Sequence, residues 1–112
     1  MLGEFEYLIL SAAANLGDEA YGAAMRAAIE STAGRPCSLG ALYTTLDRLE
    51  SKGLVQTWMG EPTQQRGGRA RRMVRVTAQG LLAAREFYDA VMRMSRGVAW
   101  AGNPADVPEG KA

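Results

Sequence analysis

The basic residues in the middle of the chain carry the main chemistry that its composition offers. Between Pro62 and Thr77 there are five arginines and no acidic residue. Formal charge is segregated along the chain, with −4 over residues 1–34, +5 over 35–75 and zero over 76–112. Guanidinium groups neutralise phosphates and bind them through paired hydrogen bonds. The pattern predicts a polyanionic partner, and the plainer alternative is a solvated arginine-rich hairpin.

Residue types used for catalysis and metal binding are scarce. The 112 residues include no histidine and one cysteine, Cys37. Ser-His-Asp triads, Cys-His dyads and the common zinc sites therefore cannot form. We expect no enzyme activity, no metal and no cofactor. Cys37 is interpreted as a small structural residue before a helix rather than as a redox switch.

Nothing in the sequence predicts a membrane partner. No apolar run approaches the roughly 20 residues that a spanning helix needs. The first residues lack a basic segment followed by an apolar one, so they do not form a secretory signal. A lone cysteine is typical of a reducing compartment. We therefore expect a cytoplasmic protein.

Three amphipathic helices are predicted in the first half of the chain. The first ends at Gly17, after apolar residues at helical spacing. The second covers about residues 20–33, with Asp18 as its N-cap. The third begins at the N-cap Ser38 and is terminated by Gly53. Its expected buried stripe consists of Leu39, Leu42, Leu46 and Leu49.

A hairpin and a fourth helix are predicted in the second half. Residues 54–60 and 73–77 alternate as strands do, and the polar, glycine-rich segment between them reads as a long basic loop. Thr77 is expected to cap a helix running to about Arg96. The apolar residues of this helix cover an arc of about 160°, whereas one packed face needs only about 100°. The surplus predicts contact with a second chain, and the alternative is a helix wedged into a single groove of its own chain.

The order of these elements predicts a mainly helical α+β fold, a winged helix-turn-helix with three helices and a two-stranded wing. In such a fold the third helix enters the major groove and the wing touches the flanking backbone. We expect a DNA-binding domain over residues 1–77, a dimerisation helix over 78–100 and a disordered tail over 101–112.

The third-helix segment also carries a family resemblance. Residues 40–55, GALYTTLDRLESKGLV, resemble the recognition-helix signature of the PadR family of transcriptional regulators. Segments 20–22, 67–69 and 76–80 are similar to the opening of that family's second helix, its wing and the start of its fourth helix. The similarity spans about residues 3–96. The family's aromatic pair on the second wing strand is replaced here by Met73-Val74.

The resemblance implies a bacterial repressor that binds a palindromic operator in double-stranded DNA as a homodimer. Family dimers form mainly through the C-terminal helix, assisted by the first. The single helix after the wing is similar to the short subgroup of the family. A second interpretation of the same fold is a protein-interaction module whose basic wing contacts an acidic partner. Operator binding with a steep salt dependence separates the two.

The residues expected to contact DNA lie on the third helix and the hairpin. Gly40 lacks a side chain and allows close approach. Tyr43 donates to a phosphate or covers the helix junction, and Arg48 contacts DNA or is solvated. Asp47 repels phosphate and stays unassigned; orienting Arg48 or Arg71 and accepting from a cytosine amino group are its alternatives. The full set is Ser38, Gly40, Tyr43, Thr44, Arg48, Lys52, Arg66, Gly67, Gly68, Arg69, Arg71 and Arg72.

The fourth helix supplies the expected dimer contacts. Trp100 near its end is expected to be a plain dimer contact. The alternative is a contact to a flat aromatic effector, which the resemblance implies because some short relatives bind such molecules at the dimer centre. The residues expected at the dimer interface are Phe87, Tyr88, Val91, Met94, Ser95 and Val98.

Overall fold

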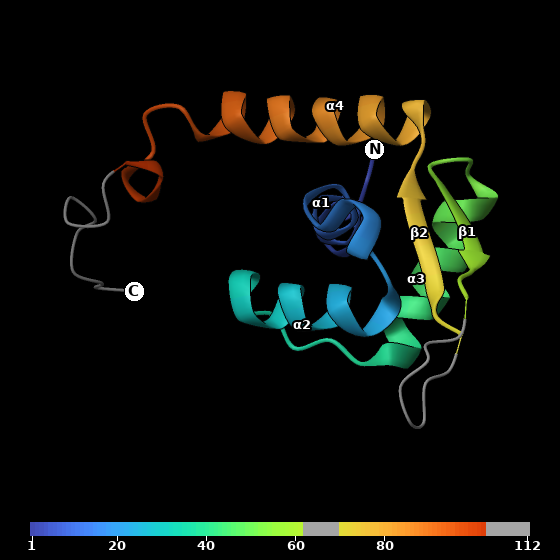
Figure 1. The fold of residues 1–112 in the computed structure, drawn as a ribbon. Helices are drawn as coiled ribbons and strands as arrows, with labels where there is room; N and C mark the ends of the chain where they lie inside the picture. Colours follow the sequence, from blue (N-terminus) through green and yellow to red (C-terminus); the bar gives the residue numbers. More distant parts are fainter. Residues whose placement is uncertain (62–69, 103–112) are drawn as a thin grey trace.

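The computed structural model describes residues 1–61 and 70–102, in which helices surround one side of a small sheet (Figure 1). The result is the predicted mainly helical α+β winged-helix fold. Its elements are α1 Glu4–Leu16, η1 Gly17–Glu19, α2 Gly22–Ala33, α3 Leu39–Ser51, β1 Val55–Met59, β2 Arg72–Val76, α4 Ala78–Ser95 and η2 Ala99–Ala101, where η marks a 3-10 turn.

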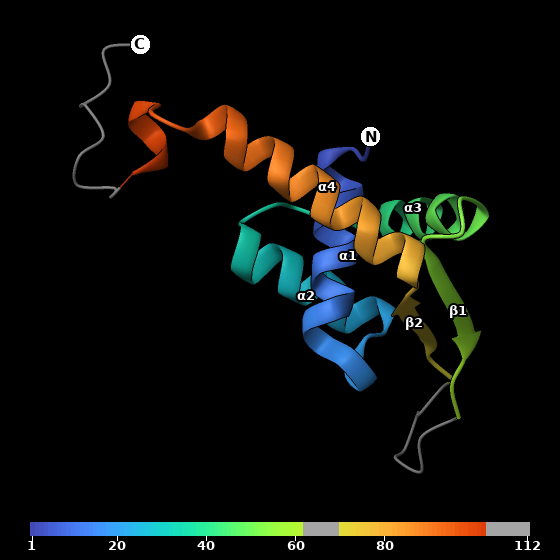
Figure 2. The same cartoon turned by 90° about the horizontal axis from the view of Figure 1, so that it is seen from above.

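Helix α1 occupies the centre of the molecule, between α2 on one side and α4 on the other (Figures 1 and 2). The predicted stripe of α3 is confirmed at Leu42, Leu46 and Leu49, which are fully buried. It is wrong at Leu39, which is 40% exposed because it is the first residue of the helix and no preceding turn covers it. The largest fully buried side chains are Ile9, Leu10, Met25, Leu42, Leu46, Leu49 and Val55.

The two strands form an antiparallel hairpin whose register runs from Val55 opposite Val76 to Met59 opposite Arg72. A third segment joins this sheet, because the Val74 N–H donates to the Ala20 carbonyl at 2.9 Å and Tyr21 bridges to Met73. This pairing holds the chain before α2 in an extended conformation.

The prediction that Asp18 caps α2 is wrong. Residues Gly17–Glu19 form η1, and α2 begins only after Tyr21, whose side chain makes no capping hydrogen bond. Because residues 20 and 21 pair with β2, they are not available to continue a helix from Asp18. Aspartate is a residue type that often caps helices, but here the pairing of residues 20 and 21 with β2 determines where α2 begins.

Two predicted caps are confirmed. The Ser38 hydroxyl accepts from the Ala41 N–H at 3.1 Å, and the Thr77 hydroxyl accepts from the Gly80 N–H at 3.0 Å. Thr77 also donates to the Gly53 carbonyl at 2.6 Å, which ties the start of α4 to the end of α3. Gly80 lets α4 approach the hairpin closely, since a Cβ there would collide with the Leu54 carbonyl oxygen. Helix α4 therefore leaves the domain in a fixed direction.

The two halves of α4 have different surroundings. At the middle of the helix, Phe87 stacks on Tyr7 of α1 with ring centroids 4.7 Å apart. The second half extends beyond α1, which α4 crosses, as Figures 1 and 2 show. Most of the expected tail, residues 103–112, lies outside the described residues. Among the helices that the structure describes, none is long and apolar enough to cross a membrane.

Candidate nucleic-acid interface

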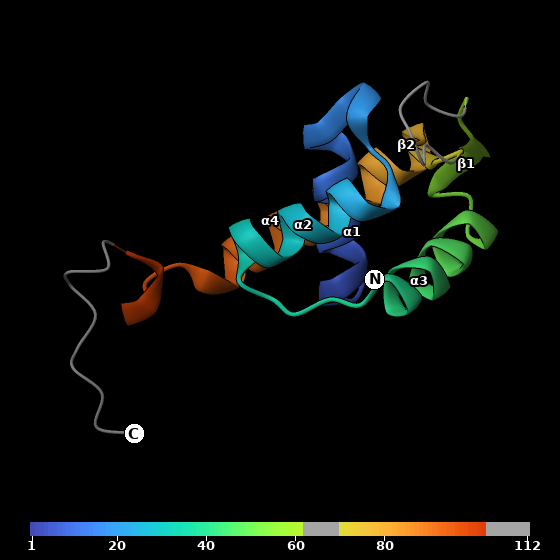
Figure 3. The same ribbon diagram turned by 60° about the horizontal axis from the view of Figure 1, so that its bottom comes forward.

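Helix α3 presents a polar stripe on the side opposite its buried leucines. Gly40, Thr44 and Arg48 are all exposed, and they share one face because they are spaced four residues apart. A Cβ built on Gly40 would meet no atom within 4 Å, so this end of the helix is open for close approach. Figure 3 shows α3 lying beside the hairpin with one long side open. The stripe has the length and polarity of a groove-reading helix.

Tyr43 lies between this stripe and the core. Its ring is half-buried and occupies the space in which a side chain at position 22 would lie, with Cε1 only 2.8 Å from a Cβ built on Gly22. The ring therefore covers the junction between α2 and α3, and its hydroxyl lies beside Gly22, the first residue of α2. The DNA contact expected of Tyr43 stays a prediction.

Asp47 has a partner that the sequence did not identify. Its Oδ1 lies 2.7 Å from Nη2 of Arg72. The sequence left Asp47 unassigned, with Arg48, Arg71 and a cytosine amino group as alternative partners. The same Nη2 lies 3.3 Å from the Thr57 hydroxyl and 3.8 Å from the Glu50 carboxylate. Arg72 therefore joins strand β2 to α3. The pairing was invisible in the sequence because it depends on how the hairpin lies against the helix.

Glu50 completes this junction from the helix side. Its Oε2 accepts from the Thr57 N–H at 2.9 Å and from the Thr57 hydroxyl at 2.7 Å. The contact satisfies a backbone donor on the free edge of β1, which has no further strand beside it in the described sheet. Neither Glu50 nor Thr57 was predicted to have a role.

Lys52, expected to contact DNA, is also ion-paired within the chain. Its Nζ lies 2.9 Å from Oε2 of Glu6, a nearly buried residue of α1. The Glu6 carboxylate also accepts from the Gly3 N–H at 3.0 Å. This backbone hydrogen bond lowers the pKa of Glu6, burial opposes the shift and Lys52 adds to it. Lys52 thus fixes the end of α3 against α1, and its contact with DNA stays a prediction.

The remaining arginines of β2 and its flank face different directions. Arg71 is exposed and its guanidinium lies 4.2 Å from the centroid of the Tyr21 ring. Arg75 lies over the Trp58 indole at 5.2 Å, on the sheet face turned away from Arg72. Residues 66–69, which hold the other predicted wing contacts Arg66, Gly67, Gly68 and Arg69, lie outside the described residues.

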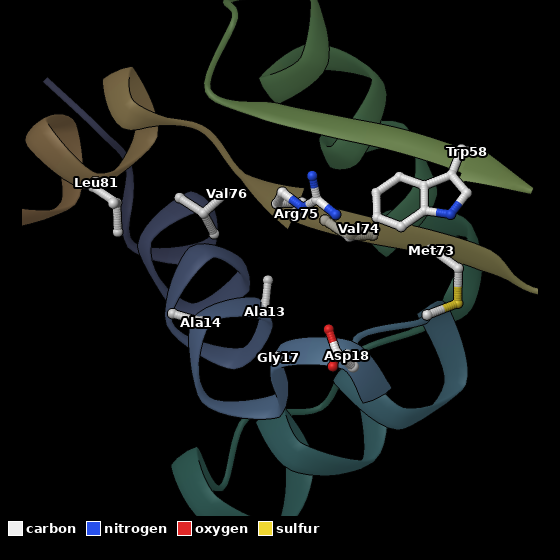
Figure 4. A pocket seen from close by; sticks show the side chains of 10 residues that line it. All are labelled: Ala13, Ala14, Gly17, Asp18, Trp58, Met73, Val74, Arg75, Val76 and Leu81. Atoms are coloured by element: carbon white, nitrogen blue, oxygen red, sulfur yellow. The ribbon is translucent and has the colours of Figure 1, made fainter. Parts of the chain in front are cut away.

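A cavity of about 330 Å³ lies beside the outer face of the hairpin, between the end of α1 and β2 (Figure 4). Figure 4 shows Trp58 and Arg75 side by side above it and the Asp18 carboxylate turned toward it. Leu81 at the start of α4 closes one end. None of the residues predicted to contact DNA lines this cavity, so the candidate interface lies elsewhere, on α3 and the wing.

Cys37 is buried just before α3. Burial raises the pKa of its thiol, and the Glu30 carboxylate acts in the same direction. A raised pKa suppresses the reactive thiolate. The surroundings therefore favour the structural interpretation of Cys37 over the redox switch. Within residues 1–61 and 70–102, no group of three or more potential metal ligands is found.

The residues expected at a dimer interface differ in their contacts within the chain and in their exposure to solvent. Phe87 packs on α1 of its own chain, and Ser95 donates its hydroxyl to the Val91 carbonyl at 2.6 Å. Val91 and Met94 are 46% and 82% exposed. The rest of the set is Tyr88, which is exposed, and Val98, which is half-buried.

Trp100 lies in η2 and is 73% exposed. It borders an open hollow of about 570 Å³ that Met92 and Val98 also line. This placement fits a dimer contact and an effector contact equally, and both stay predictions.

Comparison with known families decides the affiliation of the chain. Residues 9–86 match the transcriptional regulator PadR-like family. This range holds the C-terminal part of α1, all of α2 and α3, the hairpin and the first half of α4. The chain belongs to this family. The match includes the whole exposed stripe of α3 and its junction with the hairpin. None of the curated proteins matches the chain.

Several solved structures have a similar fold. A transcriptional regulator from Clostridium thermocellum is 22% identical, with a TM-score of 0.67 and coverage of 81% of this chain and 85% of that one. A PadR-like transcriptional regulator from Bacillus cereus is also 22% identical, with a TM-score of 0.66 and coverage of 81% and 84%. RosR of H. salinarum is 27% identical, with a TM-score of 0.61 and coverage of 88% and 81%. The PadR-family regulator thus has the winged-helix fold of these structures.

Proposed function

We propose that this PadR-family regulator is a repressor that binds double-stranded DNA through α3 and the wing. The observation that carries the proposal is the exposed stripe of Gly40, Thr44 and Arg48 on α3, backed by a buried leucine face. Small and polar side chains fit a major groove, and the arginine-rich hairpin beside them suits the phosphates that flank it. Bound at a promoter in the cytoplasm, such a protein excludes polymerase.

The proposed active species is a homodimer on an inverted-repeat operator. Support comes from the exposed apolar residues in the second half of α4, which a second copy of the chain would cover. A two-fold axis would place two α3 helices in successive major grooves, about one helical turn apart. The operator would then be a palindrome, read once by each subunit.

Salt-dependent DNA binding tests the proposal. Each phosphate contact releases counterions, so log affinity falls with log salt by about 0.9 per contact. Alanine substitutions at Arg66, Arg69 and Arg71 should each lower this slope by about 1 per subunit and weaken all sequences alike. Footprinting should show an inverted repeat protected on one face. Binding without salt dependence, together with capture of an acidic protein through the wing, would favour the interaction-module alternative.

A further inference from the structure

A carboxylate that opposes DNA binding lies beside the exposed stripe of α3. Asp47 lies one turn from both Thr44 and Ser51, and its side chain is 69% exposed. A carboxylate facing the phosphate backbone is repulsive, and like charges across an interface weaken association strongly. The helix therefore needs something to cancel this charge.

Arg72 meets that need from the strand beside it. Its side chain is only 21% exposed, and its Nη2 lies 2.7 Å from Asp47 Oδ1, 3.3 Å from the Thr57 hydroxyl and 3.8 Å from Glu50 Oε1. The guanidinium also lies over the Tyr43 ring, with 5.8 Å between Cζ and the ring centroid. Turning Arg72 toward a phosphate would break the Asp47 contact and leave two carboxylates without their cation.

We propose that Arg72 is a positioning residue that acts on DNA binding through Asp47. It neutralises the Asp47 carboxylate on the exposed face of α3 and fixes the hairpin against the helix, rather than contacting a phosphate itself. The proposal rests on the proposed DNA-binding function. It assigns different work to two neighbouring arginines, since Arg71 stays exposed beside Tyr21 while Arg72 is enclosed by Asp47, Glu50, Thr57 and Tyr43.

A double-mutant cycle on the full chain separates the two roles. The variants are Arg72→Met, which keeps the apolar stem over Tyr43, Asp47→Asn, which keeps the shape of the side chain, and their combination. Affinity and salt slope are measured on a mixed-sequence duplex of about three helical turns, so that base recognition does not enter.

The expected result is strong coupling between the two positions. Arg72→Met should weaken binding about tenfold when Asp47 is present, the size of one uncompensated like charge. It should weaken binding less than about threefold in the Asp47→Asn background, because no carboxylate remains to be neutralised. The salt slope should stay that of the parent protein, since no phosphate contact is removed. Asp47→Asn alone should bind as well as the parent or slightly better.

Arg75→Met is the matched control, because Arg75 has the same charge on the same strand and faces the opposite side of the sheet. Whatever its effect on affinity, that effect should be equal in the parent and in the Asp47→Asn background. Coupling of Arg75 to Asp47 as strong as that of Arg72 would overturn the proposal, because the coupling would then reflect net charge alone.

Three further outcomes would overturn it. An equal loss from Arg72→Met in both backgrounds, with the slope lowered by about 1 per subunit, would make Arg72 a phosphate contact. A loss of tenfold or more from Asp47→Asn alone would make Asp47 a direct contact, and this variant decides the matter even where Arg72→Met fails to fold. Absence of salt-dependent binding by the parent protein would remove the proposed function itself, a failure distinct from the other two.

Discussion

The winged-helix part of the chain and the second half of α4 differ in how far their apolar side chains are buried. In the winged-helix part most of the large apolar side chains are enclosed, with Leu39, Trp58 and Met59 among the exceptions. Two charged groups at α3 and its C-terminal end have partners within the chain, in the pairs of Asp47 with Arg72 and Lys52 with Glu6. Past Phe87, α4 carries apolar side chains into solvent.

The same helical stripe shows the change within one element. Ala84 and Phe87 pack against the domain core, and Val91 and Met94 continue that stripe along α4, where they are 46% and 82% exposed. The first part is therefore packed within its own chain, whereas the second leaves apolar side chains exposed that the proposed dimer would cover. Folding and association should accordingly respond to different substitutions.

The largest effect is expected from charges placed on the free stripe. Val91→Glu combined with Met94→Glu should convert a dimer of about twice 12.0 kDa into a monomer, because an apolar interface does not accept unpaired carboxylates. DNA affinity should then fall at least about 100-fold, since one subunit would have to bind alone. Sedimentation at micromolar concentration and DNA titration measure the two effects.

Leu82→Glu is the control for this prediction. Leu82 is 71% exposed on the same helix, but it lies about half a turn away from the stripe. The variant should remain dimeric and bind DNA as the parent does. If the parent protein is monomeric at micromolar concentration, the apolar residues in the second half of α4 do not form a dimer interface and this prediction is wrong.

The next prediction concerns the close contact between the start of α4 and the hairpin. Gly80→Ala should lower the free energy of unfolding by about 1–3 kcal/mol, because the new Cβ would collide with the Leu54 carbonyl oxygen and Val76 Cγ1 lies 2.8 Å from its position. Gly40→Ala is the matched control, since a Cβ there meets no atom within 4 Å. Because Gly40 is the second residue of α3, the variant should leave stability unchanged or raise it by less than about 0.5 kcal/mol. Equal thermal unfolding of the two variants would show that the close contact at Gly80 does not constrain the fold.

A third effect of similar size concerns recognition rather than folding. Thr44→Val and Arg48→Ala should each weaken operator binding by about 1–3 kcal/mol if these side chains reach base edges, with less effect on random DNA. Neither should change stability by more than about 0.5 kcal/mol, since both residues are exposed. Comparing operator and random duplexes for each variant provides the measurement. Equal losses on both duplexes would move these residues from base readout to backbone contact.

The fold was predictable from the sequence wherever local spacing determines it. The buried positions Leu42, Leu46 and Leu49 of α3 and the caps at Ser38 and Thr77 follow from residue type and period, and the structure has them. The start of α2 was not predictable in this way. Asp18 has the residue type of a cap, but the pairing of Ala20 and Tyr21 with β2 moves the helix start, and such a pairing depends on the tertiary fold.

The sequence predicts which residues of α3 are exposed at the candidate site, but not which charged residues pair with one another there. The exposed stripe of α3 follows from helical period. The ion pairs of Arg72 and Lys52 join residues 25 and 46 positions apart, so no local pattern reveals them. Counting the arginines in the sequence therefore overestimates how many guanidinium groups are available to bind phosphates. Opposite charges on a predicted helix and a predicted strand are the only hint that the sequence offers, and the carboxylate of Asp47 on a helix expected to face DNA is part of it.

The smallest effect is expected at the ion pair that closes the winged-helix part on the α1 side. The Gly3 N–H and Lys52 both favour the charged form of Glu6, so its pKa is lower in the folded than in the unfolded chain. A carboxyl group with a lowered pKa contributes stability that is fully present above its unfolded pKa and is lost as pH falls through the folded one. Glu6→Gln should therefore reduce the free energy of unfolding by about 1 kcal/mol at neutral pH.

The difference between Glu6→Gln and the parent should shrink as pH falls below the ordinary range of a glutamate, because the parent then loses the same contribution. Glu4→Gln is the control: Glu4 is paired with Arg35 at 3.0 Å, but its side chain is 74% exposed, so its loss should change stability by less than about 0.5 kcal/mol. Urea titrations across acidic and neutral pH measure both variants. If the difference in free energy of unfolding between Glu6→Gln and the parent grows on acidification, burial destabilises the charged form of Glu6. The winged-helix part would then resemble α4, because it would carry a side chain whose requirements its own chain does not satisfy.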